Sequence, residues 1–236
     1  MFYDTYSMIV LIPAIIFSMI ASAGVKSTFA KYTKVRNSRN ITGAEAARIM
    51  LQAKGINNVR IEPIAGNLTD NFDSRINTLH LSESVYNQST IGAVAVACHE
   101  AGHAMQHAYG YRPINIRNML VPPVNLASRF SWIFIMIGLF LVFQGKGNMS
   151  FLGDRIFNIG VLAFVIVLIF HLITLPVEFN ASSRAIQSIK ELGLVSEEEL
   201  GGAKSVLRAA AMTYVAATAV AAANLIRILM IRGRRD

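Results

Sequence analysis

The sequence is poor in cysteine and in charge. Cys98 is its single cysteine, so no disulfide bond can form within the chain. Charged residues make up 15% of the 236 residues and hydrophobic residues 53%, whereas a soluble domain typically has about 25% charged residues. Since the apolar residues also lie in long blocks, the composition excludes an ordinary soluble domain and indicates a membrane protein.

Acidic residues are fewer than basic ones, with 14 Asp and Glu against 22 Lys and Arg, so the net charge is +8. In a soluble protein such a balance would suggest nucleic acid as a partner. Here the basic residues lie beside the apolar blocks, which is the pattern of cytosolic loops and of contacts with anionic lipids. We therefore expect the lipid bilayer, and no nucleic acid, as a partner.

The first apolar block, residues 7–25, is long enough to cross a bilayer and carries no charge. A cleaved signal peptide is the competing interpretation, because Ala21-Ser22-Ala23 resembles a cleavage site. The residues before the block carry Asp4 and no basic residue, so residues 1–25 are predicted to be an uncleaved anchor. Its N-terminus is expected outside the cell, because basic residues follow the block: Lys26, Lys31, Lys34, Arg36 and Arg39.

The second half of the chain predicts more membrane helices. Residues 126–176 are expected to hold two of them, at 126–143 and 156–176, after a break at Pro122-Pro123 and with a polar loop at 144–155. A cytosolic helical segment follows at 177–208. The last segment, 209–236, is an Ala-rich membrane helix with a basic tail. If this last segment crosses the membrane completely, the terminal arginines lie outside, against the positive-inside rule. The sequence is therefore compatible with either three or four crossings.

Residues 26–118 are expected to form a cytosolic domain. Thr42 and Glu45 have the spacing of a capping box for a helix that stops at Lys54-Gly55. Alternating apolar residues predict strands at 59–64 and 76–82, separated by a turn-rich stretch. The second strand is either purely structural or an edge that pairs with an extended peptide. The predicted fold class is a mainly α membrane protein with three to four transmembrane helices and a small α+β zincin-like metallopeptidase domain.

The stretch Val94–Ala104 predicts a helix that carries the pattern H-E-x-x-H. His99 and His103 are four residues apart, so they lie on one helix face and can share one metal ion. Glu100 is rotated from His99 by about 100°, which places it beside the ion without being a ligand. This is the arrangement of a zinc site with a glutamate general base. The simpler alternative is a buried, hydrogen-bonded histidine pair, and Cys98 is expected to be a small core residue.

A catalytic zinc ion needs a third protein ligand and an open position for water. His107 shares the helix face, but it would lie about 12 Å from His99, too far for one ion. His171 is expected within a membrane helix, about 10 Å along the helix from Glu178, so the two can hardly bind one ion. His80 lies on a predicted strand. Glu178 is expected on the same side of the membrane as the histidines, because two membrane crossings separate it from them. If it is not a zinc ligand, its carboxylate is expected to form an ion pair with Arg184 or Lys190.

Three stretches carry a family resemblance: His99–His107, Gly66–Arg75 and Leu175–Ala185. Together with the order of apolar segments, they resemble the YugP-like membrane zinc metallopeptidases of bacteria, and more distantly the HtpX-like and CAAX-prenyl-protease-like membrane peptidases. In those peptidases a downstream glutamate completes the site, and the resemblance implies that Glu178 does so here, as in gluzincins. The sequence departs from the HtpX-like pattern at Ser182, where that group has an aspartate.

These observations predict a membrane-anchored zinc endopeptidase of a bacterial inner membrane, with several crossings and its active site on the cytosolic side. We expect one Zn²⁺ per chain, held by His99, His103 and Glu178, with Glu100 as general base. The expected substrates are peptides or membrane proteins, while a homo-oligomer or a partner protein stays open. The alternatives are a catalytically silent zinc-binding membrane scaffold and a metal transporter, although a transporter would place its ligands within the membrane helices.

Overall fold

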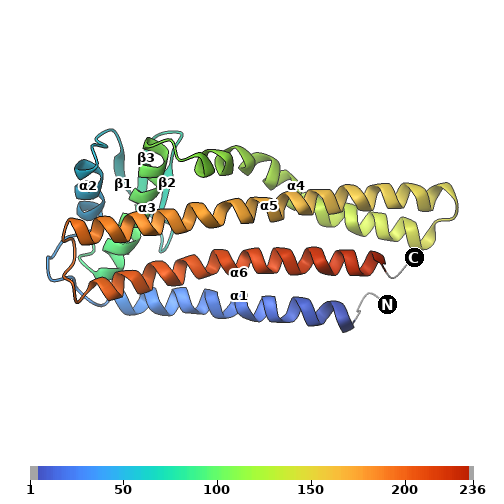
Figure 1. Ribbon diagram of the computed structural model, residues 1–236, viewed down its shortest axis with the longest axis horizontal. Helices are drawn as coiled ribbons and strands as arrows, with labels where there is room; N and C mark the ends of the chain where they lie inside the picture. The colour runs from blue at the N-terminus through green and yellow to red at the C-terminus, as the bar shows by residue number, and fades with distance from the viewer. Residues whose placement is uncertain (1–4, 234–236) are drawn as a thin grey trace. The chain divides into compact units, whose positions relative to one another are not determined.

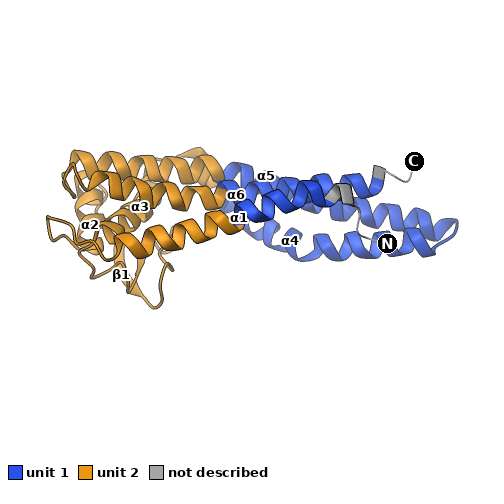
Figure 2. Ribbon diagram, turned by 90° about the horizontal axis from the view of Figure 1, so that it is seen from below, with its two compact units in different colours: residues 1–18, 116–174, 215–236 blue, residues 19–115, 175–214 orange. Residues whose placement is uncertain are grey.

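The computed structural model describes residues 5–233 and the side chains of residues 8–232. Asp4, Arg234 and Arg235, which bear on the expected orientation, lie outside this range. Contacts divide the chain into two compact units, which Figure 2 distinguishes by colour. Unit 1 comprises residues 1–18, 116–174 and 215–236, and unit 2 comprises residues 19–115 and 175–214.

The described chain is mainly helical, with one small sheet (Figure 1). Four helices are long and apolar enough to cross a membrane, which confirms the predicted fold class. The elements in chain order are α1 (Thr5–Tyr32), α2 (Gly43–Ala53), β1 (Arg60–Ile64), β2 (Asn71–Asp73), β3 (Thr78–Ser82), α3 (Ile91–Ala108), α4 (Arg112–Gln144), α5 (Asn148–Glu191) and α6 (Leu200–Gly233).

The sheet in unit 2 has the strand order β1-β3-β2. β3 pairs in parallel with β1 and antiparallel with β2, so both of its edges are occupied. Of the two alternatives for this strand, the edge that is open to a peptide is therefore wrong, and the structural strand is what the sheet shows. The reason is β2, which forms within the stretch expected to be turns, where Phe72 lies opposite Leu79. Both edge strands, β1 and β2, flank a central strand whose residues are nearly all buried.

Helix α3 is largely buried within unit 2, with 14 of its 18 residues buried. Its N-cap is Thr90, whose side chain accepts a hydrogen bond from the backbone of Ala93, and its C-cap is Tyr109, so the stretch Val94–Ala104 lies wholly within the helix, as predicted. Most of its residues are small, which allows close packing on several sides at once. The predicted capping box of α2 is also present, since Thr42 and Glu45 bond each other's backbone. These two capped helices pack on each other and support the sheet.

The long helices continue further than the sequence predicts. Pro122 and Pro123 lie inside α4, so the expected break is absent. Pro176 likewise lies inside α5, which runs on to Glu191, and the loop expected at 144–155 shrinks to residues 145–147. Proline is tolerated inside membrane helices because neighbouring groups satisfy the freed backbone carbonyls. Glu178 is consequently in the middle of a continuous helix.

Unit 1 contains the hairpin of α4 and α5, whose helices meet at glycines (Figure 1). A Cβ atom on Gly138 would lie 2.5 Å from the backbone nitrogen of Phe157, and one on Gly160 would lie 2.8 Å from that of Ile135. Contacts this short leave no room for a methyl group. Small residues at helix contacts in membranes let the backbones approach closely, and van der Waals packing then holds the helices together.

We expect Gly138→Ala to destabilise the protein by about 1–3 kcal/mol, because the added methyl forces the two backbones apart. The measurement is unfolding of the detergent-purified protein by heat or by increasing SDS. Gly24→Ala in α1 is the control, since a Cβ there meets nothing within 4 Å. Equal stability of the two variants would contradict the packing role of Gly138.

Candidate metal centre

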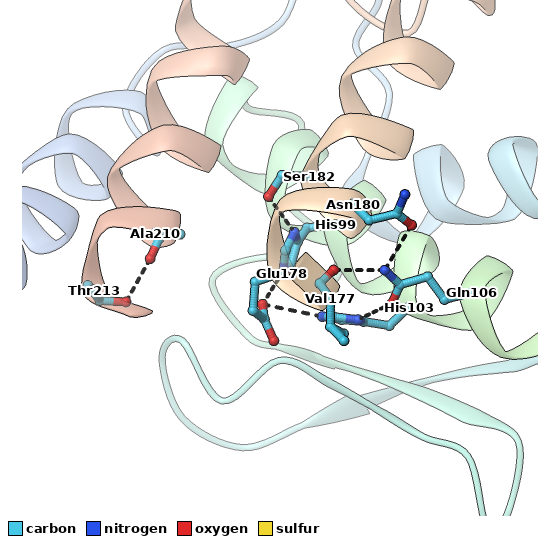
Figure 3. A network of polar contacts seen from close by, with 9 residues as sticks. All are labelled: His99, His103, Gln106, Val177, Glu178, Asn180, Ser182, Ala210 and Thr213. Carbon is cyan, nitrogen blue, oxygen red and sulfur yellow. Dashed lines mark hydrogen bonds and ion pairs between the residues drawn. The ribbon is translucent and has the colours of Figure 1, made fainter. Parts of the chain in front are cut away.

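Helices α3 and α5 bring three metal-ligating side chains together within unit 2 (Figure 3). The carboxylate Oε2 of Glu178 lies 3.3 Å from His99 Nε2 and 3.6 Å from His103 Nε2. One ligand atom from each residue lies within 4.8 Å of the others. All three side chains are almost completely shielded from solvent, with Glu178 only 1% exposed. The structure thus brings together the three residues that the sequence analysis names as candidate zinc ligands.

A chain of hydrogen bonds fixes the ring of His103. The amide nitrogen of Gln106 donates to the backbone oxygen of Val177 at 2.7 Å and to Asn180 Oδ1 at 3.0 Å. Its amide oxygen is therefore left to accept from His103 Nδ1, 3.0 Å away. With the proton on Nδ1, the lone pair of Nε2 points toward Glu178. A metal-binding histidine is usually held in this way by a partner on its other nitrogen.

The same chain continues away from the histidine. Asn180 Oδ1 also accepts from Arg184 Nε at 2.7 Å, so the orientation of the Asn180 amide is fixed too. The guanidinium of Arg184 lies 5.7 Å from the centre of the Tyr109 ring, and the Tyr109 hydroxyl donates to the backbone oxygen of Lys54. The network thereby connects the C-terminal end of α3 to α5 and α2, which makes it rigid.

His99 has a different partner on its second nitrogen. Its Nδ1 lies 3.1 Å from the hydroxyl of Ser182, one turn after Glu178 on α5. This is the position at which the HtpX-like pattern has an aspartate. A hydroxyl can accept the Nδ1 proton without adding a charge to the site. The departure at Ser182 thus keeps the orienting contact while removing a carboxylate.

Gly102 allows α3 and α5 to approach. A Cβ atom on Gly102 would lie 2.7 Å from the backbone oxygen of Ala181. Ala181 itself is fully buried. Any larger residue at position 102 would push α5 away from the histidines, because the obstacle is backbone and cannot turn aside. The glycine within the motif therefore sets the distance between Glu178 and the two imidazoles.

Glu100 lies beside the three candidate ligands. Burial raises the pKa of its carboxyl, the charges of His103 and His99 lower it, and those of Glu178 and Asp70 raise it further; the net direction is upward. The carboxylate of Asp70, which helps to raise the pKa of Glu100, accepts hydrogen bonds from the backbone nitrogen and the hydroxyl of Ser82. A raised pKa makes a carboxylate a better proton acceptor, since its basicity comes closer to that of its target.

The other histidines considered as ligands lie elsewhere. His107 is exposed, and its ring centre lies 6.0 Å from that of Phe72 on β2. His80 faces Asn71 and Glu62 across the sheet. Arg184 Nε donates to Asn180 Oδ1, whereas the carboxylate of Glu178 lies against the two imidazoles. His171 belongs to unit 1, whereas the three clustered residues belong to unit 2.

The donor set fits zinc. Two imidazole nitrogens and one carboxylate oxygen form a ligand set known for catalytic zinc, which leaves a fourth position for water. Both imidazoles have an orienting partner, and the site is buried enough to strengthen electrostatic interactions. Cys98 is fully buried next to His99, and burial raises the pKa of its thiol, so it is unsuited as a thiolate ligand.

Sequence reasoning missed two residues of this site. Gln106 is three residues after His103 and hence on the same helix face, which is a detectable signal for an orienting partner. Gly102 is a glycine inside an otherwise Ala-rich helix, and a glycine there usually has a packing reason. Both follow from helix geometry once the histidines are identified. By contrast, the role of Asn180 needs the contact between α3 and α5.

The chain is similar in sequence to known proteins. A family model described as "Putative neutral zinc metallopeptidase" matches residues 7–233. The chain is similar to the "Putative membrane protease YugP" of Bacillus subtilis (strain 168), with 42% identity over 220 residues and 93% of each chain covered. No solved structure matches the chain.

We expect Gly102→Ala to weaken zinc binding by about 10–100-fold, the loss seen when the supports of a metal ligand are disturbed. The measurement is competition for zinc with a chromophoric chelator. Gly201→Ala in α6 is the matched control, because a Cβ there meets nothing within 4 Å. An unchanged zinc affinity in the Gly102 variant would show that the close approach of α3 and α5 does not determine the geometry of the zinc ligands.

Proposed function

The chain belongs to the family of neutral zinc metallopeptidases, and from this premise we propose that it is a membrane-anchored zinc endopeptidase of the gluzincin type. In this proposal His99, His103 and Glu178 hold one Zn²⁺ and Glu100 is the general base. The observation that carries it is the convergence of two oriented imidazoles and a buried carboxylate beside a second glutamate.

Zinc, when bound, would supply a Lewis acid that polarises the scissile carbonyl and makes water a stronger nucleophile. Glu100 accepts the proton of the attacking water and delivers it to the leaving amine. The raised pKa of Glu100 suits both steps. Gln106 and Ser182 hold the imidazoles in place while charge develops. A purely structural zinc site needs no such base and is usually closed by four ligands, which argues against a silent scaffold.

The substrate is proposed to be a protein segment in extended conformation near the membrane. β2 pairs with β3 on one side in the described part of the chain, and the ring of Phe72 on β2 approaches His107 of α3. An extended peptide can add to such a strand edge through backbone hydrogen bonds, which recognise many sequences. Four candidate membrane helices in the same chain favour substrates that lie in or next to the bilayer.

The active site is proposed to lie on the cytosolic side of a bacterial inner membrane. The basic cluster after the first apolar block favours that side for residues 26–111, by the positive-inside rule. Helix α4 and the apolar part of α5 then cross and return, which keeps His99 and Glu178 on one side. Lys146, between α4 and α5, and Arg232, at the end of α6 if that helix crosses completely, would both lie outside, against the positive-inside rule.

We expect His99→Ala and Glu178→Ala to abolish stoichiometric zinc in the purified protein, because each removes a ligand. Glu100→Gln should keep zinc but lower the rate of cleavage of unfolded casein by about 10²–10⁴-fold, since the proton acceptor is gone. Metal analysis and casein cleavage are measured on the same samples. Glu191→Ala, which removes an exposed carboxylate of α5, is the control and should retain both properties.

Zinc that stays in Glu178→Ala would exclude Glu178 as third ligand and direct the search to His80 or His171. A wild-type protein that takes up no zinc when it is offered would overturn the peptidase proposal.

The cytosolic location can be tested by labelling intact cells with a membrane-impermeant maleimide. Cys98 is buried with a raised pKa, so it should not react and can stay in place. We expect Asn67→Cys, an exposed residue of unit 2, to be labelled only after cell lysis. Lys146→Cys, exposed between α4 and α5, should be labelled in intact cells. The reverse pattern would place the metal centre outside.

A further inference from the structure

A groove of about 740 Å³ lies within unit 2 between α5 and α6, on the side of α5 that also carries Ser182. We call it the α5–α6 groove. Its lining residues from α5 are Phe179, Ser182, Ser183, Ile186 and Gln187, and those from α6 are Lys204, Leu207, Arg208, Ala211 and Met212. Each set recurs every three or four residues, so each forms one stripe along its helix. The groove is thus a channel between two helix faces.

The two cations of the groove lie toward the connection between α5 and α6, and the end far from this connection is apolar. Because α5 and α6 are joined by the short segment 192–199, residues at equal distances from it lie at similar heights. Gln187 and Lys204 are nearest to the connection, and Arg208 follows one turn further. Beyond them lie Phe179, which is 47% exposed, and Met212. The two exposed cations, Lys204 and Arg208, are four residues apart and hence on one face of α6.

This order of groups matches the order of groups in a lipid. The connection 192–199 carries the charged capping residues Glu197–Glu199, so it belongs in water or at the headgroup level. The helices on either side continue as candidate membrane spans. A molecule with an anionic end near Lys204 and Arg208 and a hydrocarbon chain along Phe179 and Met212 would complement both the charge and the polarity gradient. A peptide helix would need no such pair of cations.

We propose that an anionic phospholipid binds in the α5–α6 groove, with its phosphate between Lys204 and Arg208 and an acyl chain along the apolar end. The lining residue Ser182 also contacts His99 Nδ1, so the lipid lies next to the support of the candidate metal centre. Binding of the lipid does not depend on peptidase activity. It therefore can be tested even if the proposed function fails.

The experiment is native mass spectrometry of the full-length protein in detergent, titrated with phosphatidylglycerol or with phosphatidylcholine of the same acyl chains. We expect the wild type to bind one phosphatidylglycerol in preference to phosphatidylcholine. Lys204→Gln with Arg208→Gln should weaken phosphatidylglycerol binding roughly thirty-fold, for two cations that face the lipid. Lys26→Gln with Lys190→Gln removes the same charge outside the groove and should change binding by less than about threefold.

Met212→Trp tests the acyl-chain end, because the larger side chain fills the groove while both cations remain. We expect it to lower phosphatidylglycerol binding without affecting metal content. As a second measurement, a phosphatidylglycerol with a photoreactive group on its acyl chain should label the wild-type peptides that contain Phe179 or Met212.

Equal losses in the two charge variants would show diffuse attraction to the basic surface and would overturn the proposal. So would unchanged binding in Met212→Trp together with labelling confined to other helices, which would indicate a different lipid site or a groove reserved for a substrate segment. A wild type that binds both lipids equally would refute the role of the cations. If the lipid binds as proposed while casein is not cleaved, the result supports the lipid site in the groove and contradicts the peptidase proposal.

Discussion

The contact between Gly102 of α3 and Ala181 of α5 is the constraint on which the geometry of the candidate metal centre depends. At this point a backbone oxygen of α5 occupies the space that any side chain at position 102 would need. The approach brings Glu178, one turn before Ser182, to both imidazoles. It also brings Val177 and Asn180 within reach of Gln106. A separation even slightly larger would break the ligand set and its supporting hydrogen bonds together.

Burial of so many polar groups is costly unless each one is satisfied. The network meets this requirement by assigning donors and acceptors along a chain: Arg184 to Asn180, Gln106 to Asn180 and Val177, and His103 to Gln106. Each hydrogen bond fixes the orientation of the next group. Asn180, which is two hydrogen bonds away from His103, therefore helps to decide that Nδ1 of the His103 ring carries the proton. The small residues around the motif complete this environment by excluding water from α3.

Much of this arrangement could be predicted from local sequence, because its causes are local. The H-E-x-x-H spacing places His99 and His103 on one face, and Thr90 and Thr42 mark the helix starts. Local sequence patterns cannot predict which distant segments pair with each other. β2 forms from polar residues because β3 offers it an edge, and this made β3 a central strand. The pair Pro122-Pro123 predicts a break by propensity, but the long helix α4 accommodates it, as α5 accommodates Pro176. Glu178 was found through a family resemblance, since nothing in its own neighbourhood distinguishes it from other helical glutamates.

One short stretch of α5 contributes residues both to the candidate metal centre and to the α5–α6 groove. Glu178 and Ser182 face the histidines, while Phe179, Ser183 and Ile186 lie along the α5–α6 groove. On a helix, adjacent residues point in directions about 100° apart, so the two faces meet at Ser182, which belongs to both. Because α5 is continuous from Asn148 to Glu191, with Pro176 inside it, Glu178 and the α5 residues of the groove belong to one uninterrupted helix.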